Sequence, residues 1–162
     1  MPQTTYKSAG VDIQAADEFL KNAGREISST FTEGVLTDIG HFGAFFQPKL
    51  DNITEPVLVS STDGVGTKVK VAGMAGRHDT VGQDLLNHCV NDIMCAGAQP
   101  MFFMDYLAMG KMDKSVALEL VQGICKAARE NQVAVIGGET AEMPGIYLPG
   151  EYDLAGTIVG IA

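Results

Sequence analysis

Residues 56–68 restrict the possible fold most, because a short apolar run leads directly into a polar, glycine-containing stretch. Residues 56–59 (Pro-Val-Leu-Val) are predicted to form a buried strand, since the run is short and rich in β-branched residues. Residues 60–68 then bring an acidic residue, two glycines one residue apart, a threonine and a lysine. Glycines let backbone N–H groups approach an anion closely, and a lysine adds a mobile positive charge. The pattern indicates a strand followed by a ligand-binding loop.

Asp63 at the start of this loop suggests a divalent cation. A carboxylate repels phosphate, but it can hold Mg²⁺, which usually combines one or two carboxylates with substrate oxygens. The spacing matches neither the P-loop nor the dinucleotide-binding glycine pattern. A strand–helix or hairpin turn with Lys68 on the surface is therefore an equally good interpretation of these residues alone.

Composition limits the partners that a chain of this kind can have. The 162 residues are enough for one domain with a real core. Eleven Lys and Arg against 20 Asp and Glu give a net charge of −9, which argues against nucleic acid as a partner. Three cysteines without a Cys-x-x-Cys pair indicate reduced, mostly buried thiols and a cytoplasmic protein. No apolar run reaches membrane-spanning length.

The periodicity of apolar residues predicts an α+β fold. Helices are expected from about residue 12 to residue 27 and over residues 69–75, 79–96 and 114–131; strands are expected over residues 40–46, 56–59, 101–109, 132–136 and 153–162. This order predicts a mixed sheet of four to five strands with helices packed on one face. The other face would need a cover, for which a partner subunit is the simplest choice.

The helix over residues 79–96 carries a second candidate site. Asp84, His88 and Asp92 recur every fourth residue, so neighbouring members lie close enough to interact. Two carboxylates around an imidazole would suit a transition metal, whereas Mg²⁺ would take the carboxylates alone. A solvated polar helix face is the simpler interpretation of the complete triplet, and we favour it.

Residues 137–145 (Gly-Gly-Glu-Thr-Ala-Glu-Met-Pro-Gly) repeat the theme of a strand followed by small residues, an acid and a hydroxyl. Such a turn could present Glu139 and backbone amides to the same ligand as Asp63. A plain Gly-Gly turn is the alternative.

Asp105 interrupts an apolar strand, so its carboxylate is either hydrogen-bonded in the core or directed at a site near the strand end. His41 has no acidic or cysteine neighbour at ligand spacing and is interpreted as structural or exposed in a loop.

Taken together, these motifs resemble one enzyme family. The matching segments, spread in order over nearly the whole chain, are residues 6–12 (Tyr-Lys-Ser-Ala-Gly-Val-Asp), 62–68 (Thr-Asp-Gly-Val-Gly-Thr-Lys), 77–80 (Arg-His-Asp-Thr), 89–92 (Cys-Val-Asn-Asp), 102–106 (Phe-Phe-Met-Asp-Tyr) and 137–145. They resemble the N-terminal domain of the aminoimidazole ribonucleotide synthetases, also called phosphoribosylformylglycinamidine cyclo-ligases. His41 departs from the family pattern, which usually has a glycine there.

The resemblance implies an ATP-dependent ring closure in de novo purine biosynthesis. ATP would activate the amide oxygen of formylglycinamidine ribonucleotide as a phosphate ester, and an internal nitrogen would then displace phosphate. The roles carried over are these: Lys7 and Lys68 as catalytic residues; Asp63, Gly64, Gly66, Thr67, Asp92, Gly137, Gly138, Glu139 and Thr140 for ATP; and Asp63, Asp92 and Glu139 for Mg²⁺. Asp105 is a weaker candidate, and the family pattern does not support His88.

The resemblance also implies an architecture. Residues 1–162 would form the ATP-binding and dimerisation domain, with residues 1–12 as a flexible arm and the family's second domain absent. Two such domains would pair their sheets into a closed dimeric β-barrel. The alternatives are another ATP-using relative, of the selenophosphate synthetase or thiamine-phosphate kinase type, and a fragment that only binds and dimerises without catalysis.

Overall fold

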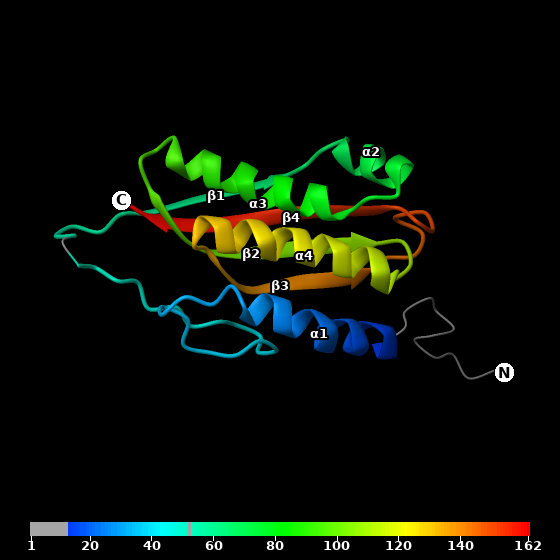
Figure 1. Ribbon diagram of the computed structural model, residues 1–162, viewed down its shortest axis with the longest axis horizontal. Helices are drawn as coiled ribbons and strands as arrows, with labels where there is room; N and C mark the ends of the chain where they lie inside the picture. The colour runs from blue at the N-terminus through cyan, green and yellow to red at the C-terminus, as the bar shows by residue number, and fades with distance from the viewer. Residues whose placement is uncertain (1–12, 52) are drawn as a thin grey trace.

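A mixed four-stranded sheet forms the centre of the computed structural model, which describes residues 13–51 and 53–162 (Figure 1). The strands are β1 (Leu58–Gly64), β2 (Gln99–Met109), β3 (Ala134–Glu142) and β4 (Tyr152–Ile161), in the spatial order β1-β4-β2-β3. Strand β4 runs antiparallel to both of its neighbours, whereas β2 and β3 are parallel. The predicted mixed sheet is confirmed with four strands, and β1 and β3 are its two edges.

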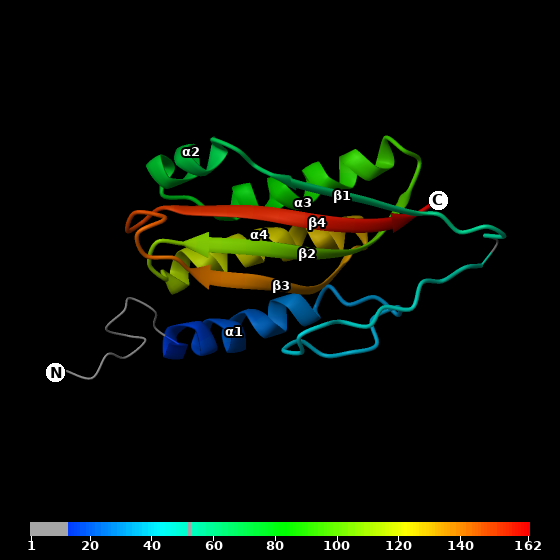
Figure 2. The same ribbon diagram turned by 180° about the vertical axis from the view of Figure 1, so that it is seen from behind.

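The helices lie on one side of this sheet. They are α1 (Ile13–Ser28), α2 (Lys68–Ala75), α3 (Asp79–Met94) and α4 (Lys114–Asn131). Helices α3 and α4 cover the sheet, and α1 packs beside α4 along the β3 edge (Figure 1). The reverse view shows the other face of the sheet without a covering helix from the described part of the chain (Figure 2). The predicted arrangement with helices on one face is therefore confirmed.

Local sequence signals explain where α4 begins and where α4 and α2 end. Helix α4 begins after Asp113, whose side chain accepts hydrogen bonds from the backbone N–H groups of Ser115 and Val116. It ends at Gln132, which adopts the left-handed conformation with φ 56°. Helix α2 ends in the same way at Gly76, with φ 59°. These signals are local, and the bounds predicted for residues 114–131 match the structure.

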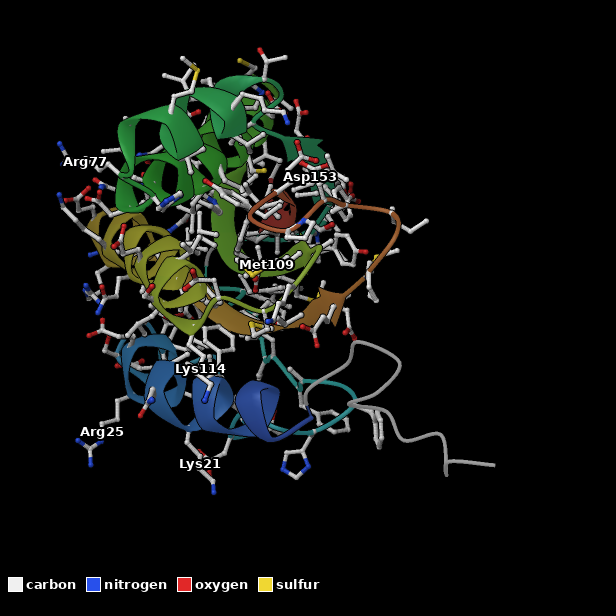
Figure 3. All side chains as sticks on the ribbon, turned by 90° about the vertical axis from the view of Figure 1, so that its right-hand side faces the viewer. Lys21, Arg25, Arg77, Met109, Lys114 and Asp153 are labelled. Atoms are coloured by element: carbon white, nitrogen blue, oxygen red, sulfur yellow. The ribbon has the colours of Figure 1, made fainter. Side chains whose placement is uncertain are left out.

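The core fills the space between the helices and the sheet. Its fully buried side chains include Leu85, Leu86 and Ile93 from α3, Leu120 from α4, and Phe103, Met109, Leu154 and Ile158 from the sheet. In the end-on view of Figure 3, Met109 lies between the helices and the sheet, whereas Lys21 and Arg25 project outward from α1. Two of the three cysteines, Cys89 and Cys125, are buried as predicted, but Cys95 is exposed.

Helices α3 and α4 approach each other closely through two glycines. A Cβ atom added to Gly123 would lie 2.0 Å from the backbone oxygen of Asp79. A Cβ atom added to Gly82 would lie 2.2 Å from the backbone oxygen of Leu120. Since both contacts are to main-chain atoms of the opposing helix, no side-chain movement can relieve them.

Two predictions about strands are wrong. Residues 40–46 form turns and bends instead of a strand, and they contribute only an isolated bridge between Val35 and Phe46. Gly40 turns the chain with φ 105°, and Phe42 is fully exposed, so no sheet face is available for these apolar residues. The strand predicted as buried at residues 56–59 is instead an exposed edge, with Val57 and Leu58 both more than half exposed.

Two predicted turns also belong to strands. Strand β1 continues through Asp63 to Gly64, and the expected loop begins only after it. Strand β3 runs through Gly137 and Gly138 to Glu142, because those residues pair with β2 in register. Glycines in a strand also allow a neighbouring group to approach the backbone closely. A Cβ atom on Gly138 would lie 2.2 Å from Oδ1 of Asp105.

Among residues 13–51 and 53–162, no helix has the length and hydropathy needed to cross a bilayer.

Candidate functional site

Three side chains with metal-binding atoms converge between β1 and α3. They are Asp63, His88 and Asp92, and one potential ligand atom from each lies within 4.8 Å of the others. Nε2 of His88 lies 2.8 Å from Oδ2 of Asp63, and Ser61 donates a hydrogen bond of 2.8 Å to Oδ2 of Asp92. Two carboxylates and an imidazole can together hold a divalent cation.

Secondary structure explains this convergence. Alternate residues of β1 point to the same face of the sheet, so Ser61 and Asp63 both face α3. His88 and Asp92 are four residues apart and share one side of α3. The cluster therefore depends on β1 continuing past Ser60, which the sequence interpretation did not foresee.

Hydrogen bonds keep the Asp63 carboxylate ionised. Its Oδ1 accepts a bond of 2.7 Å from the backbone N–H of Gly64. This bond, followed by the bond with His88, lowers the pKa of Asp63 below its ordinary value. An ionised, half-exposed carboxylate is in the state that metal binding requires.

Asp84 is separated from the other members of the predicted triplet. Its carboxylate forms an ion pair with Lys68 at the start of α2. These two residues line a cavity of about 390 Å³ between α2 and α3, together with Val71, Thr80 and others. Lys68, which was expected to contact phosphate, therefore lies beside the cluster but pairs with Asp84 in this structure.

The loop between β1 and α2 contains one glycine in the left-handed conformation. Gly66 has φ 59°, a conformation that favours glycine, and Thr67 directly precedes α2 without a side-chain capping bond. Gly64 supplies the backbone N–H group that Asp63 accepts from. Lys7, the other residue expected to be catalytic, lies outside the described residues, as does the arm predicted for residues 1–12.

The second predicted group lies at the opposite edge of the sheet. In register, Asp63 pairs with Gly156, Gly156 with Asp105, and Asp105 with Gly138. Three inter-strand steps separate Asp63 from Gly138, which amounts to about 14 Å. Gly137, Gly138, Glu139 and Thr140 line a different cavity, beside α1. Within one chain, Glu139 therefore lies too far from Asp63 for the two carboxylates to share one metal ion.

His88 joins the cluster through a partner that the sequence interpretation did not give it. Its spacing to Asp92 was visible in the sequence, but Asp84 was taken as the second carboxylate. The structure replaces Asp84 with Asp63, which lies 25 residues before His88. Only the pairing of β1 with β4 and its packing against α3 bring these residues together.

Comparison with protein families and curated proteins gives a consistent result. A family model for the N-terminal domain of AIR synthase related protein matches residues 49–162. The phosphoribosylformylglycinamidine cyclo-ligase of Trichlorobacter lovleyi is 54% identical over 160 residues, which cover 99% of this chain and 46% of the relative. The enzyme of the same name from Oleidesulfovibrio alaskensis is 54% identical over 157 residues, which cover 97% of this chain and 45% of that relative. The chain thus spans about half the length of these relatives.

Solved structures share the fold at lower identity. A thiamine-monophosphate kinase from Stenotrophomonas maltophilia superposes with a TM-score of 0.68 at 22% identity, covering 89% of this chain and 42% of that one. The hydrogenase maturation protein HypE in complex with ATP gives a TM-score of 0.55 at 20% identity, covering 88% of this chain and 37% of that one. Identities this low establish the common fold and nothing further.

Proposed function

The chain belongs to the AIR synthase related proteins, whose N-terminal domain it matches, and from this we propose that it contributes the nucleotide and metal site of a phosphoribosylformylglycinamidine cyclo-ligase. The whole enzyme would close formylglycinamidine ribonucleotide to aminoimidazole ribonucleotide in de novo purine biosynthesis. ATP would phosphorylate the amide oxygen, and an internal nitrogen would displace phosphate. The convergence of Asp63, His88 and Asp92 carries the proposal for this chain, because phosphoryl transfer needs a cation beside the phosphates.

The donor set fits a divalent cation. Asp63 and Asp92 would hold Mg²⁺ through their carboxylates, and the cation would neutralise charge on the phosphates. Gly66 and Thr67 follow at once and would offer backbone N–H groups to the nucleotide, whereas the N–H group of Gly64 donates to Asp63. Lys68 would exchange its partner Asp84 for a phosphate oxygen, since the ion pair is half exposed.

Glu139, Gly137, Gly138 and Thr140 would act from the other edge of the sheet. If two sheets close into one barrel, β1 of one copy lies beside β3 of the other, which brings residues 137–140 of one copy to the edge that carries Asp63 of the other. Within residues 13–51 and 53–162, no further strand pairs with the outer side of β1 or β3 and no helix covers the second face, which supports such a pairing. On that face, Leu58 is 66% exposed, Tyr106 38% and Met104 37%.

A charged residue on this face is expected to separate the dimer. Met104→Glu would place a carboxylate in the centre of the proposed barrel, where burial without a partner is costly. Sedimentation equilibrium should then report the mass of one chain, against two for the wild type. Met94→Glu is the matched control, because Met94 is 58% exposed at the end of α3 and should leave the dimer intact. A monomeric wild type would contradict the dimer.

His88 is expected to let the cluster of Asp63, His88 and Asp92 bind Co²⁺ and Mn²⁺ as well as Mg²⁺. Imidazole is a good ligand for Co²⁺ and Mn²⁺, whereas Mg²⁺ prefers oxygen. His88→Gln should therefore raise the dissociation constant for Co²⁺ by roughly tenfold or more and leave that for Mg²⁺ nearly unchanged. Calorimetry and the visible absorption of bound Co²⁺ measure both. Equal losses for the two metals would mean that His88 supports the site only through Asp63.

The reaction itself is best measured on a protein of the relatives' full length, because this chain spans about half of it. Such an enzyme containing this chain should form aminoimidazole ribonucleotide, ADP and phosphate from formylglycinamidine ribonucleotide and ATP when Mg²⁺ is present. A related kinase activity is the second candidate, but the thiamine-monophosphate kinase shares only 22% identity with this chain. Phosphorylation of thiamine phosphate without ring closure would favour it and overturn the proposal.

A further inference from the structure

Ser61 is a polar residue on the side of β1 that packs against α3 (Figure 1). Val59 and Ser61 are half-buried, whereas the residues next to them in the strand are exposed, so both point toward the helices. Across the strand pair, Ser61 lies opposite Ile158, which is fully buried. Because apolar side chains fill most of this side of the sheet, packing alone does not account for a hydroxyl group here.

The hydroxyl group of Ser61 links β1 to the carboxylate of Asp92 in α3. Its Oγ donates a hydrogen bond of 2.8 Å to Oδ2 of Asp92, which lies 31 residues further along the chain. Among residues 13–51 and 53–162, no other group donates a hydrogen bond to this carboxylate. The pairing of β1 with β4 is made by the backbone and does not require the hydroxyl group. The bond therefore connects the strand and the helix at the place where the metal-binding atoms converge.

The two carboxylates of the cluster are held in different ways. Asp63 is bonded to the backbone N–H of Gly64 and to His88, whereas Asp92 depends on Ser61. Asp92 is exposed on its helix, so its side chain could otherwise occupy several rotamers. A hydrogen bond to one oxygen restricts this freedom and leaves the other oxygen free to bind a cation. Partners of this kind, which bind a ligand residue and not the metal, typically contribute roughly 10–100-fold to metal affinity.

We propose that Ser61 is a positioning residue of the metal site, which holds the carboxylate of Asp92 in the orientation that a divalent cation needs. This role rests on the proposed function, because it takes Asp92 to be a metal ligand. Ser61 acts through Asp92 and does not itself contact the cation. Since Asp92 would bind Co²⁺ as well as Mg²⁺, loss of the hydroxyl group should weaken the binding of both metals. Replacement of His88, in contrast, is expected to weaken Co²⁺ binding alone.

Calorimetric titration of Co²⁺ and of Mg²⁺ into this chain tests the role of Ser61 without any turnover. Ser61→Ala should raise both dissociation constants by roughly tenfold, whereas Ser61→Thr retains the hydroxyl group and should retain most of the affinity. Ser60→Ala is the matched control, because the hydroxyl group of Ser60 donates to the backbone oxygen of Ile158 and Ser60 is exposed. Its metal affinities should equal those of the wild type. Circular dichroism without metal verifies that all three variants fold.

The visible absorption of bound Co²⁺ separates positioning from direct ligation. At saturating Co²⁺, Ser61→Ala should give the wild-type spectrum, because the ligand atoms are unchanged. A different spectrum would make Ser61 a ligand itself and would overturn its positioning role.

Unchanged affinities in Ser61→Ala, or equal losses in Ser61→Ala and either Ser60→Ala or Ser61→Thr, would also overturn the role of Ser61. If the wild type binds both metals and Ser61→Ala binds them equally well, the proposed metal site stands and only the role of Ser61 fails. If the wild type binds neither metal, the proposed metal site fails and the role of Ser61 fails with it.

Discussion

Asp63→Asn is expected to lower ATP-dependent ring closure by the full-length enzyme roughly 100-fold or more, because a neutral amide is a poor ligand for Mg²⁺. The exchange preserves the size of the side chain. It removes the ionised oxygen that lies closest to His88 and the charge that the Gly64 N–H group stabilises. The rate at saturating ATP should fall, and the concentration of Mg²⁺ needed for half-maximal activity should rise.

Excess Mg²⁺ provides an internal check on this prediction. If Asp63 acts as a ligand, a high concentration of Mg²⁺ should restore part of the activity of Asp63→Asn. Asp51→Asn removes an equal charge from an exposed residue outside the cluster and should retain the wild-type rate. A rate for Asp63→Asn close to that of the wild type would exclude Asp63 from the reaction.

Gly123→Ala is expected to give the largest loss of stability, roughly 3 kcal/mol in the free energy of unfolding, because the added methyl group overpacks a rigid contact. The new Cβ atom would lie 2.0 Å from the backbone oxygen of Asp79, so α3 and α4 would have to separate. For a domain of this size the melting temperature should fall by about 6–12 °C. Thermal unfolding followed by circular dichroism measures the change.

Gly73→Ala is the matched control. Gly73 is an exposed residue inside α2, and a Cβ atom there would meet nothing within 4 Å. Because alanine favours the helix more than glycine does, this variant should gain about 0.5–1 kcal/mol. Destabilisation by both variants would show that the effect arises from glycine replacement in general and not from the contact between α3 and α4.

Elements with local signals were predictable from the sequence. The bounds of α4 follow from a capping aspartate and an apolar stripe, and the structure reproduces them. Helix α2 and strand β4 also lie close to the predicted ranges. The resemblance placed the chain in the correct family, and Asp63 and Asp92, its two principal metal candidates, lie in one cluster.

The predictions that failed concern features that depend on contacts between distant segments. Strand β1 continues to Gly64 because β4 offers it partners, and β3 continues through Gly137 and Gly138 because β2 does. The turn-like residues of both segments favour a loop when only the sequence is considered. The same non-local pairing places Asp63 and Glu139 on opposite edges and turns His88 toward Asp63, and no local periodicity contains this information.

Calorimetric titration of ATP into this chain, with and without Mg²⁺, tests the central claim most directly. The account predicts saturable binding that requires Mg²⁺, because Asp63 and Asp92 repel the phosphates until a cation lies between them. Binding of equal strength without Mg²⁺ would contradict the metal cluster. Absence of binding under both conditions would contradict the claim that this chain carries the nucleotide site.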